Sequence, residues 1–480
     1  MIRKPATFFA TVLAMAMGVA ACDDDDNNTT GPTPEGPTFA LRVVHASPDA
    51  PSVDIWAEGV NAPLFEDVAY GDATDYLDIP EGTYNIQIRA AGSAASSTPV
   101  FETGDLTLSE GDRVTAVAAG FLASSNADDQ FRVLPFFEDF GATGTGALVR
   151  IVHASPDAPT VAIDVGNDGT PEIQSLARFE DTGQAGVELP AGQALQIGIW
   201  AGNPLQRVTA FTTPQLPVGG ELFVIATGSL AKLPRETDGF ALLAVAPAGA
   251  IGFVRQNPTV YALHAGPDAP AVDIFAGSLE LVDNISFGDL SGGIQVPPGT
   301  YTLDFFPTSA GSTRPGGSPA ASLDTPMLDA GERYVAVATG FLAPDMGEQP
   351  FQLLAYPEGF AFDPANTRAR AIHASPDAPA VDIGTASGST IDAVVFEDLA
   401  FAEGSDAAGT AIPATSLTLG VAPTGSTAAV ATFDVTTVGD LRAFTIAVGA
   451  LAPDTGEEGF RLVLVNTSVS PWTASEIAAN

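Results

Sequence analysis

One seven-residue motif recurs four times in this chain and constrains its architecture more than any other feature. The motif is His-Ala-Ser-Pro-Asp-Ala-Pro, with Gly in place of Ser in the third copy, and its copies begin at His45, His153, His264 and His373. These are the only histidines, and they lie 108, 111 and 109 residues apart. A period of that length matches a whole domain rather than a solenoid turn or a propeller blade. The sequence therefore predicts four tandem copies of one module.

Within the first copy, short apolar or alternating segments are separated by turn signals. Residues 83–89 alternate with period two after the turn at residues 80–82, and similar segments recur every 8–12 residues. About seven such segments without a sustained helical period are typical of a β-sandwich. We predict an all-β protein of four immunoglobulin-like (Ig-like) β-sandwich modules, called modules one to four, and short joins that allow limited bending. The modules are expected at residues 38–140, 147–247, 258–360 and 368–470.

The first 21 residues have the pattern of a signal peptide. Arg3 and Lys4 precede an apolar run at residues 6–20, which is too short to span a bilayer. The run ends in Val-Ala-Ala-Cys at residues 19–22, which resembles the lipobox of bacterial lipoproteins and implies lipid on the sulfur and amino group of Cys22. Two or more acyl chains hold a protein stably on a membrane. We expect a lipid-anchored protein, the alternative being an ordinary cleaved signal with an incidental cysteine.

Residues 22–37 are polar and rich in Pro and Gly, so we expect a disordered tether. An acidic run at residues 23–26 follows the cysteine directly. In enteric bacteria an Asp there resembles an inner-membrane retention signal, whereas in some other groups an acidic run resembles a surface-export signal. We predict an exported protein anchored to the cell envelope, with the outer membrane or cell surface favoured.

The chain is strongly acidic, with 58 Asp and Glu against 18 Lys and Arg and a formal net charge of −40. Nucleic acid is excluded as a partner, because phosphate binding needs a basic surface. The single cysteine excludes internal disulfides, so each module must be held together by its own core. We expect a monomer, bound to the membrane through its lipid anchor, with a surface protein or a polysaccharide as candidate partner.

The repeated segment of residues 42–55 resembles the family called domain of unknown function DUF4397. The resemblance covers residues 38 to about 470 and implies an exported or surface protein of tandem β-rich modules, without an assigned reaction. Asp54, Asp273 and Asp382 keep the later aspartate of the motif, whereas module two has Ala162 there.

The repeated histidines and the motif aspartates are the candidate site residues, and we predict a structural role for both. The aspartates are Asp49, Asp157, Asp268 and Asp377. A histidine before a Pro-Asp turn can be held by that aspartate or by a backbone carbonyl. A ligand or metal site is the alternative, although one histidine per module falls short of the three or four ligands of a zinc site.

Catalytic motifs are missing from the sequence. Ser47 lies two residues from His45 on one strand, which is poor geometry for a nucleophile and its base, and Gly266 replaces this serine in module three. We therefore predict no enzymatic activity and no catalytic residue.

One loop resembles a calcium site. Asp164, Asp168 and Glu172 stand at positions one, five and nine, with a glycine at six, as in calcium loops of the EF-hand and integrin-repeat kind. The loop departs from them at position three, which is Gly166, and lacks the glutamate at twelve. A plain turn at residues 167–169 is the alternative.

Together these features predict a non-enzymatic cell-envelope lipoprotein for adhesion, display or envelope organisation. The alternative is a carbohydrate- or calcium-binding surface protein, with Trp56 or Trp200 as exposed sugar contacts. Trp56 fits a core position equally well.

Overall fold

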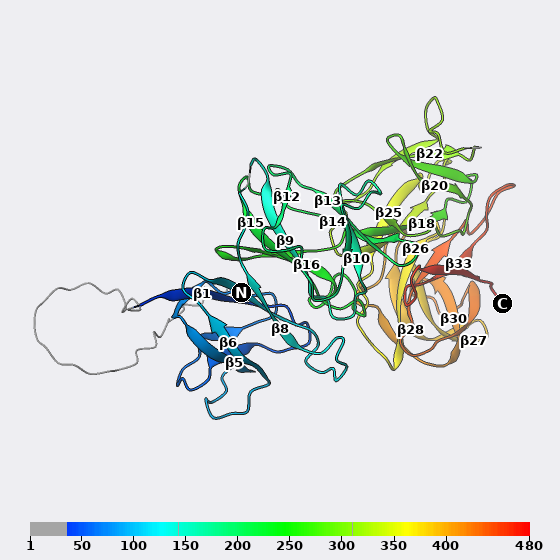
Figure 1. Cartoon of the computed structure of the whole chain (residues 1–480). Coiled ribbons are helices and arrows are strands. Elements are labelled where there is room, and N and C mark those ends of the chain that lie inside the picture. The colour runs from blue at the N-terminus through cyan, green and yellow to red at the C-terminus, as the bar shows by residue number, and fades with distance from the viewer. Residues whose placement is uncertain (1–35, 143, 310) are drawn as a thin grey trace, which may run out of the picture. The chain divides into compact units, whose positions relative to one another are not determined.

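Each module is a sandwich of two β-sheets in the computed structural model, which describes residues 36–142, 144–309 and 311–480 (Figure 1). The strands of module one are β1 Thr38–His45, β2 Val53–Ala57, β3 Phe65–Val68, β4 Leu77–Pro80, β5 Gly82–Ala90, β6 Phe101–Leu108, β7 Arg113–Ala119 and β8 Arg132–Phe137. One sheet has the order β4-β1-β7-β8 and the other β3-β2-β5-β6. No helix occurs among the described residues, and the all-β class with four sandwich modules is confirmed.

The same strand order recurs in the other three modules, and modules two and four add a ninth strand. Module two contains β9 Ala147–His153, β10 Val161–Val165, β11 Ile173–Leu176, β12 Val187–Leu189, β13 Gln196–Ala201, β14 Gln206–Thr212, β15 Glu221–Thr227, β16 Ala241–Ala246 and β17 Gly249–Val254. Module three contains β18 Thr259–Ala265, β19 Val272–Ala276, β20 Leu279–Ile285, β21 Ile294–Gln295, β22 Thr302–Pro307, β23 Ala321–Asp324, β24 Arg333–Thr339 and β25 Gln352–Pro357. Module four contains β26 Asn366–Ala374, β27 Val381–Ser387, β28 Thr390–Leu399, β29 Thr410–Pro413, β30 Ser416–Pro423, β31 Ala431–Thr436, β32 Arg442–Val448, β33 Arg461–Asn466 and β34 Thr473–Ile477.

The strand order refines the Ig-like description. An immunoglobulin constant domain divides seven strands into the sheets ABED and CFG. In module one, strands one, four, seven and eight form one sheet, and β1 pairs with β7 in parallel. We call the sheet that contains the motif strand the inner sheet, and its partner in the sandwich the outer sheet.

The motif strand is buried on both faces. Leu41 and Val43 point into the core between the two sheets of module one, whereas Val44 and Ala46 belong to a second cluster on the opposite face. Strands in such a position are near-continuous apolar runs rather than alternating ones. The run around each motif histidine is therefore explained by two cores rather than one.

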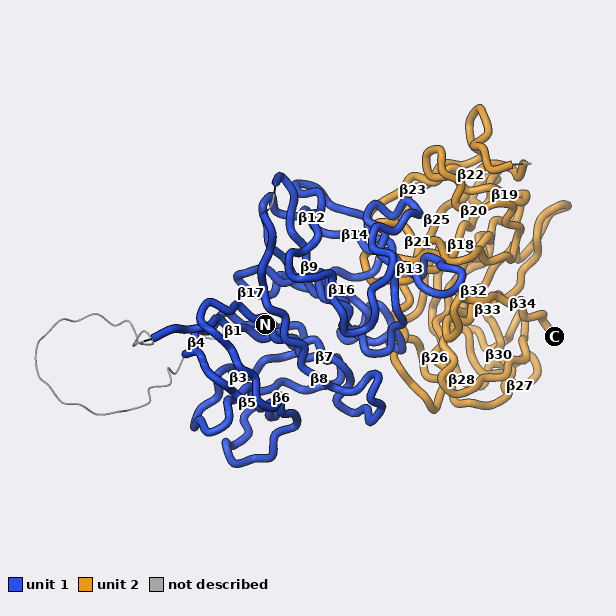
Figure 2. The backbone as a smooth tube through the Cα atoms, in the orientation of Figure 1, with its two compact units in different colours: residues 1–256 blue, residues 257–480 orange. Residues whose placement is uncertain are grey.

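The second cluster joins modules in pairs. The chain divides into unit 1, which ends at Gln256, and unit 2, which begins at Asn257 (Figure 2). In each unit the inner sheets of two modules pack against each other, so the layers run outer, inner, inner, outer. Unit 1 does so through residues of β1, β7 and β8 against residues of β9, β15 and β16. Unit 2 uses β18 and β24 against β26, β32 and β33.

Of the joins, residues 363–368 and the described residues of 141–146 lie inside one unit each. The join at 246–257 contains strand β17. Strand β34 extends module four beyond the expected end at residue 470. Among the described residues there is no helix long and apolar enough to cross a membrane.

Candidate functional site

The four motif histidines occupy equivalent buried positions, each at most 2% exposed. Each Nε2 lies near the carbonyl oxygen of the proline that ends its motif, at 3.1 Å from Pro51, 2.9 Å from Pro159, 3.0 Å from Pro270 and 3.0 Å from Pro379. Because a carbonyl oxygen only accepts, Nε2 carries the proton and donates it. The histidine thus closes the turn of its own motif.

The second ring nitrogen, Nδ1, is an acceptor in this tautomer. It accepts the backbone N–H of Ser47 at 3.4 Å and of Ser375 at 3.3 Å in modules one and four. Nδ1 of His153 and His264 is buried without a partner among the described residues. Burial is the main cause that lowers the pKa of all four imidazoles, because a charged ring would lose its hydration. The buried neutral ring suits a structural role.

The motif aspartate holds a loop that lies 73 to 75 residues later in the chain. The Asp49 carboxylate accepts the N–H of Leu122 at 2.7 Å and of Ala123 at 2.9 Å. The same pair of bonds recurs in the other modules, to Leu230 and Ala231, Leu342 and Ala343, and Leu451 and Ala452. Of the two partners expected for the histidine, the structure therefore shows the backbone carbonyl and not this aspartate.

A glycine precedes each of these loops for a steric reason. Gly120 has φ 87°, and a Cβ there would lie 2.3 Å from the carbonyl oxygen of Gln130. Ser47 Oγ donates to the Gly120 carbonyl at 2.6 Å, which ties the motif to this loop a second time. In module three the ring of Phe351 fills the corresponding space, since a Cβ on Gly266 would lie 2.8 Å from it.

A second buried aspartate follows the motif and also binds backbone. In module one, Asp54 accepts the N–H of Asp67 at 2.9 Å and of Gly92 at 2.8 Å. Asp273 and Asp382 make the equivalent bonds in modules three and four. Module two lacks this aspartate but has a buried Asp164 two residues later on the same strand, where it accepts from other loop residues.

The three residues of the candidate calcium loop do not bring their oxygens together. Asp164 accepts the N–H of Asp168 at 3.1 Å and the Nε1–H of Trp200 at 3.2 Å. Asp168 accepts from Thr170 at 3.0 Å, and Glu172 accepts from Val165 at 2.6 Å. These bonds are those of a hydrogen-bonded turn at the end of β10.

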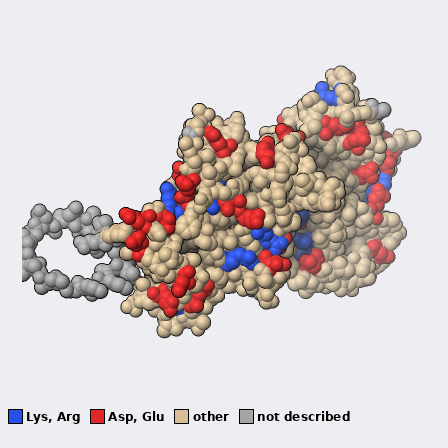
Figure 3. Space-filling model, in the orientation of Figure 1, with Lys and Arg blue, Asp and Glu red and all other residues tan. Residues whose placement is uncertain are grey.

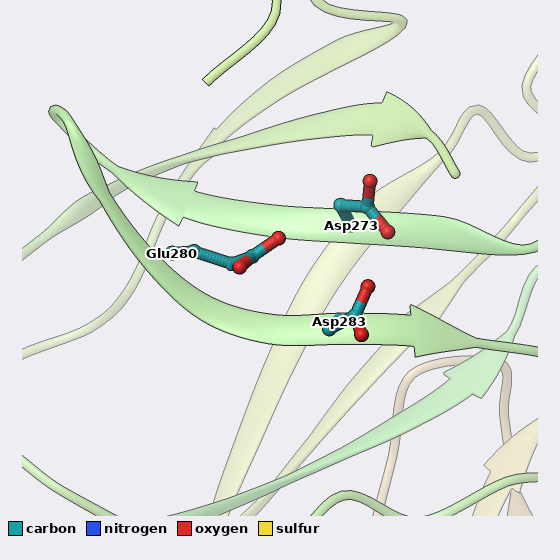
Figure 4. Close-up of side chains that lie close together, drawn as sticks. All are labelled: Asp273, Glu280 and Asp283. Carbon is teal, nitrogen blue, oxygen red and sulfur yellow. The ribbon is translucent and has the colours of Figure 1, made fainter. Parts of the chain in front are cut away.

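A different acidic group was not expected from the sequence. The carboxylates of Asp273, Glu280 and Asp283 offer ligand oxygens within 4.8 Å of one another (Figure 4). Desolvation and then the charges of the other two raise the pKa of Glu280. Both oxygens of Asp273 already accept backbone N–H groups. No spacing rule reveals the group, because a strand bulge in β20 brings Glu280 and Asp283 to the same side.

The expected aromatic sugar contacts are not exposed platforms. Trp56 is only 6% exposed, and the guanidinium of Arg89 lies over its ring at 5.9 Å. Trp200 is half-buried and bonded to Asp164. The prediction of an exposed sugar contact is therefore wrong for Trp56, whose burial fits the alternative of a core position. Cys22, the signal peptide and most of the tether lie outside the described residues.

Two comparisons bear on identity. The model of the family described as domain of unknown function (DUF4397) matches residues 39–164 and 258–384, which together make up more than half of the chain. Each match begins with an odd-numbered module and ends at the second strand of the next one. The search of curated proteins found no match to the chain.

Proposed function

The chain belongs to the DUF4397 family, and from this premise we propose that it is a non-enzymatic protein of the cell envelope, anchored by lipid on Cys22, that serves adhesion, display or envelope organisation. One observation carries the proposal. The motif histidine and aspartate, which recur in every module, bond to the backbone of their own module. Their role in each copy is to hold the fold.

The arrangement of sheets supports a role in presenting surfaces. Since the inner sheets cover each other, the outer sheets and loops are the surfaces left for partners.

The anchor and the exposure can be tested with one labelling experiment. After cleavage before Cys22, Lys232 would be the only lysine of the mature chain, and its side chain is 47% exposed. We expect a membrane-impermeant amine-reactive biotin to add one label to the protein on intact cells. An acylated Cys22 has no free amino group, so a second label would mark an unlipidated N-terminus.

Two variants complete the design. Lys232→Arg should abolish labelling without altering membrane attachment. Cys22→Ser should release the protein from the membrane fraction. Labelling only after cell lysis would contradict surface display, and continued membrane attachment of Cys22→Ser would contradict the lipid anchor.

A further inference from the structure

Module two differs from the other modules at the residue that faces its motif histidine. Elsewhere this residue is aromatic, and its ring centroid lies 6.2 Å (Tyr70), 6.3 Å (Phe287) or 6.3 Å (Phe401) from that of the histidine. In module two it is Arg178. The positions are equivalent because in all four modules the N–H of the next residue donates to the carbonyl of the motif histidine. A cation thus replaces a ring at one of four equivalent places.

The residue that follows is also unusual. Phe179 has φ 66°, where the other modules have Gly71, Gly288 and Ala402. A bulky side chain is strained in this left-handed region, and such strain often marks a functional site. The guanidinium carbon of Arg132, a residue of module one, lies over the ring of Phe179 at 4.0 Å from the ring centroid. The strained residue therefore places a ring against an arginine of the paired module.

The two guanidinium groups lie close together. Arg132 Nη2 donates to the carbonyl of Ala127 at 2.6 Å, and Arg178 Nη1 donates to the carbonyl of Asp128, the next residue, at 3.1 Å. Each Nε also donates to a backbone carbonyl. Arg132 Nη1 and Arg178 Nη2 have no partner within the described part of the chain. Neutral acceptors thus fix both groups while leaving N–H donors and positive charge available.

In unit 2 the arginine equivalent to Arg132 is Arg461, and carboxylates neutralise its charge. Arg461 begins β33 as Arg132 begins β8, and it lies at 4.7 Å over the ring of Phe287, which is the counterpart of Arg178. Arg461 forms ion pairs with Glu458 and with Glu476, the latter at 2.8 Å. Neither Arg132 nor Arg178 forms an ion pair with a carboxylate of the described residues.

The two arginines belong to a strongly acidic chain. The chain has 58 acidic residues, and Figure 3 shows acidic side chains scattered over the visible face, with basic ones confined to a few patches. Within the described ranges, Arg132 and Arg178 lie side by side without an ion pair, and the charges of Asp128 and Asp129 also act on Arg132. Burial and then the charge of Arg178 lower the pKa of Arg132, whereas the charges of Asp128 and Asp129 act in the opposite direction.

We propose that Arg132 and Arg178 form a binding site for one oxyanion, a carboxylate or phosphate group, at the contact between modules one and two. Guanidinium groups bind such groups through paired charge-assisted hydrogen bonds. The group belongs either to free phosphate or to an acidic glycan of the envelope. The site depends on neither the lipid anchor nor surface display, so its failure would leave the proposed function standing.

Binding can be measured by titration calorimetry on the full mature chain carrying Cys22→Ser, at low ionic strength. The two probes are inorganic phosphate and trigalacturonate. We expect saturable one-site binding that weakens at least about tenfold in Arg178→Tyr and in Arg132→Gln. Arg178→Tyr restores the residue type of module one, so the fold should survive, and a thermal melt checks this.

Matched controls separate a site from general charge. Arg461→Gln and Arg207→Gln each remove one positive charge elsewhere and should change the affinity less than about twofold. Asp128→Asn removes an exposed competing carboxylate from the loop between the two arginines and should strengthen binding. Binding of phosphate alone identifies the free ion, and tighter binding of trigalacturonate identifies the glycan. Binding of neither probe, or equal losses in the Arg461→Gln and Arg178→Tyr variants, would overturn the proposal.

Discussion

The two units pack the same sheets with different side chains. In unit 1 the contact is reciprocal and polar: Arg42 donates to the carbonyl of Ala246 in module two, and Arg150 donates to that of Phe137 in module one, both at 2.6 Å. In unit 2, Arg370 makes the equivalent bond to Pro357 at 2.9 Å. The other arginine position is Tyr261, and its ring stacks on Trp472 with centroids 4.3 Å apart.

Comparing the two units shows which features of the contact between paired modules are shared and which are replaced. Both units share the apolar faces of the inner sheets and one arginine bond across the contact. The second arginine is replaceable by an aromatic stack. We expect apolar burial to contribute most of the pairing energy, because it involves a whole sheet face, whereas a single hydrogen bond contributes about 0.5–1.5 kcal/mol.

The largest expected effect comes from the shared apolar layer. Phe223 in β15 and Phe444 in β32 are equivalent, and both are 0% exposed. Phe223→Ala should lower the free energy of unfolding of unit 1 by about 3–5 kcal/mol, and Phe444→Ala should do the same for unit 2. Denaturant unfolding followed by limited proteolysis assigns each loss to a unit. Equal losses in both units from one substitution would contradict separate units.

A smaller loss is expected from removing Arg150, whose bond across the contact has its counterpart at Arg370 in unit 2. Arg150 is 3% exposed and pairs with Asp181 at 2.5 Å as well as with Phe137. Arg150→Met keeps much of the volume but leaves both acceptors without their donor, so unit 1 should lose about 1–3 kcal/mol. Arg207→Met, at an exposed position, is the control. A loss no greater than that of the control would show that the bond is dispensable.

The aromatic replacement in unit 2 should contribute less. Tyr261→Leu keeps an apolar side chain but removes the stack on Trp472, at an expected cost of about 0.5–1.5 kcal/mol. Equilibrium unfolding of unit 2 measures this cost. If Tyr261→Arg restored the lost stability, the two solutions would be interchangeable, whereas a larger loss would show that each depends on its surroundings.

The smallest expected difference between the units is in how their stability depends on pH. Each motif histidine has a folded pKa below its ordinary value of 6.5, so the unfolded chain binds more protons below that pH. The histidine contribution to stability is complete above pH 6.5 and is lost as the pH falls from 6.5 through the folded pKa. Arg178 lowers the pKa of His153 further, so unit 1 should lose more than unit 2. Unfolding curves between pH 7.5 and 5 measure this, and Arg178→Tyr should reduce the difference. A gain of stability on acidification that His153→Gln abolished would contradict the assignment.

Features local in sequence could be predicted from it. Alternation at residues 83–89 predicts β5, and the turn residues of the motif mark the end of β1. The partners of the motif could not be predicted, because Asp49 binds a loop 73 residues away. The run at Val43 and Val44 does indicate a strand buried on both faces, but not which module covers the second face. The Arg132–Arg178 pair could not be predicted from the sequence either, because it forms only where two modules meet.

The central claim is that modules fold and open in pairs through their inner sheets. Hydrogen exchange of the full mature chain carrying Phe223→Ala tests it most directly, by comparing peptides from β7 of module one with those from β24 of module three. Phe223 lies in module two, yet we expect β7 to lose protection together with β15, while β24 stays as in the unsubstituted chain. Unchanged protection of β7 alongside an opened β15 would contradict the claim and return the molecule to four independent modules.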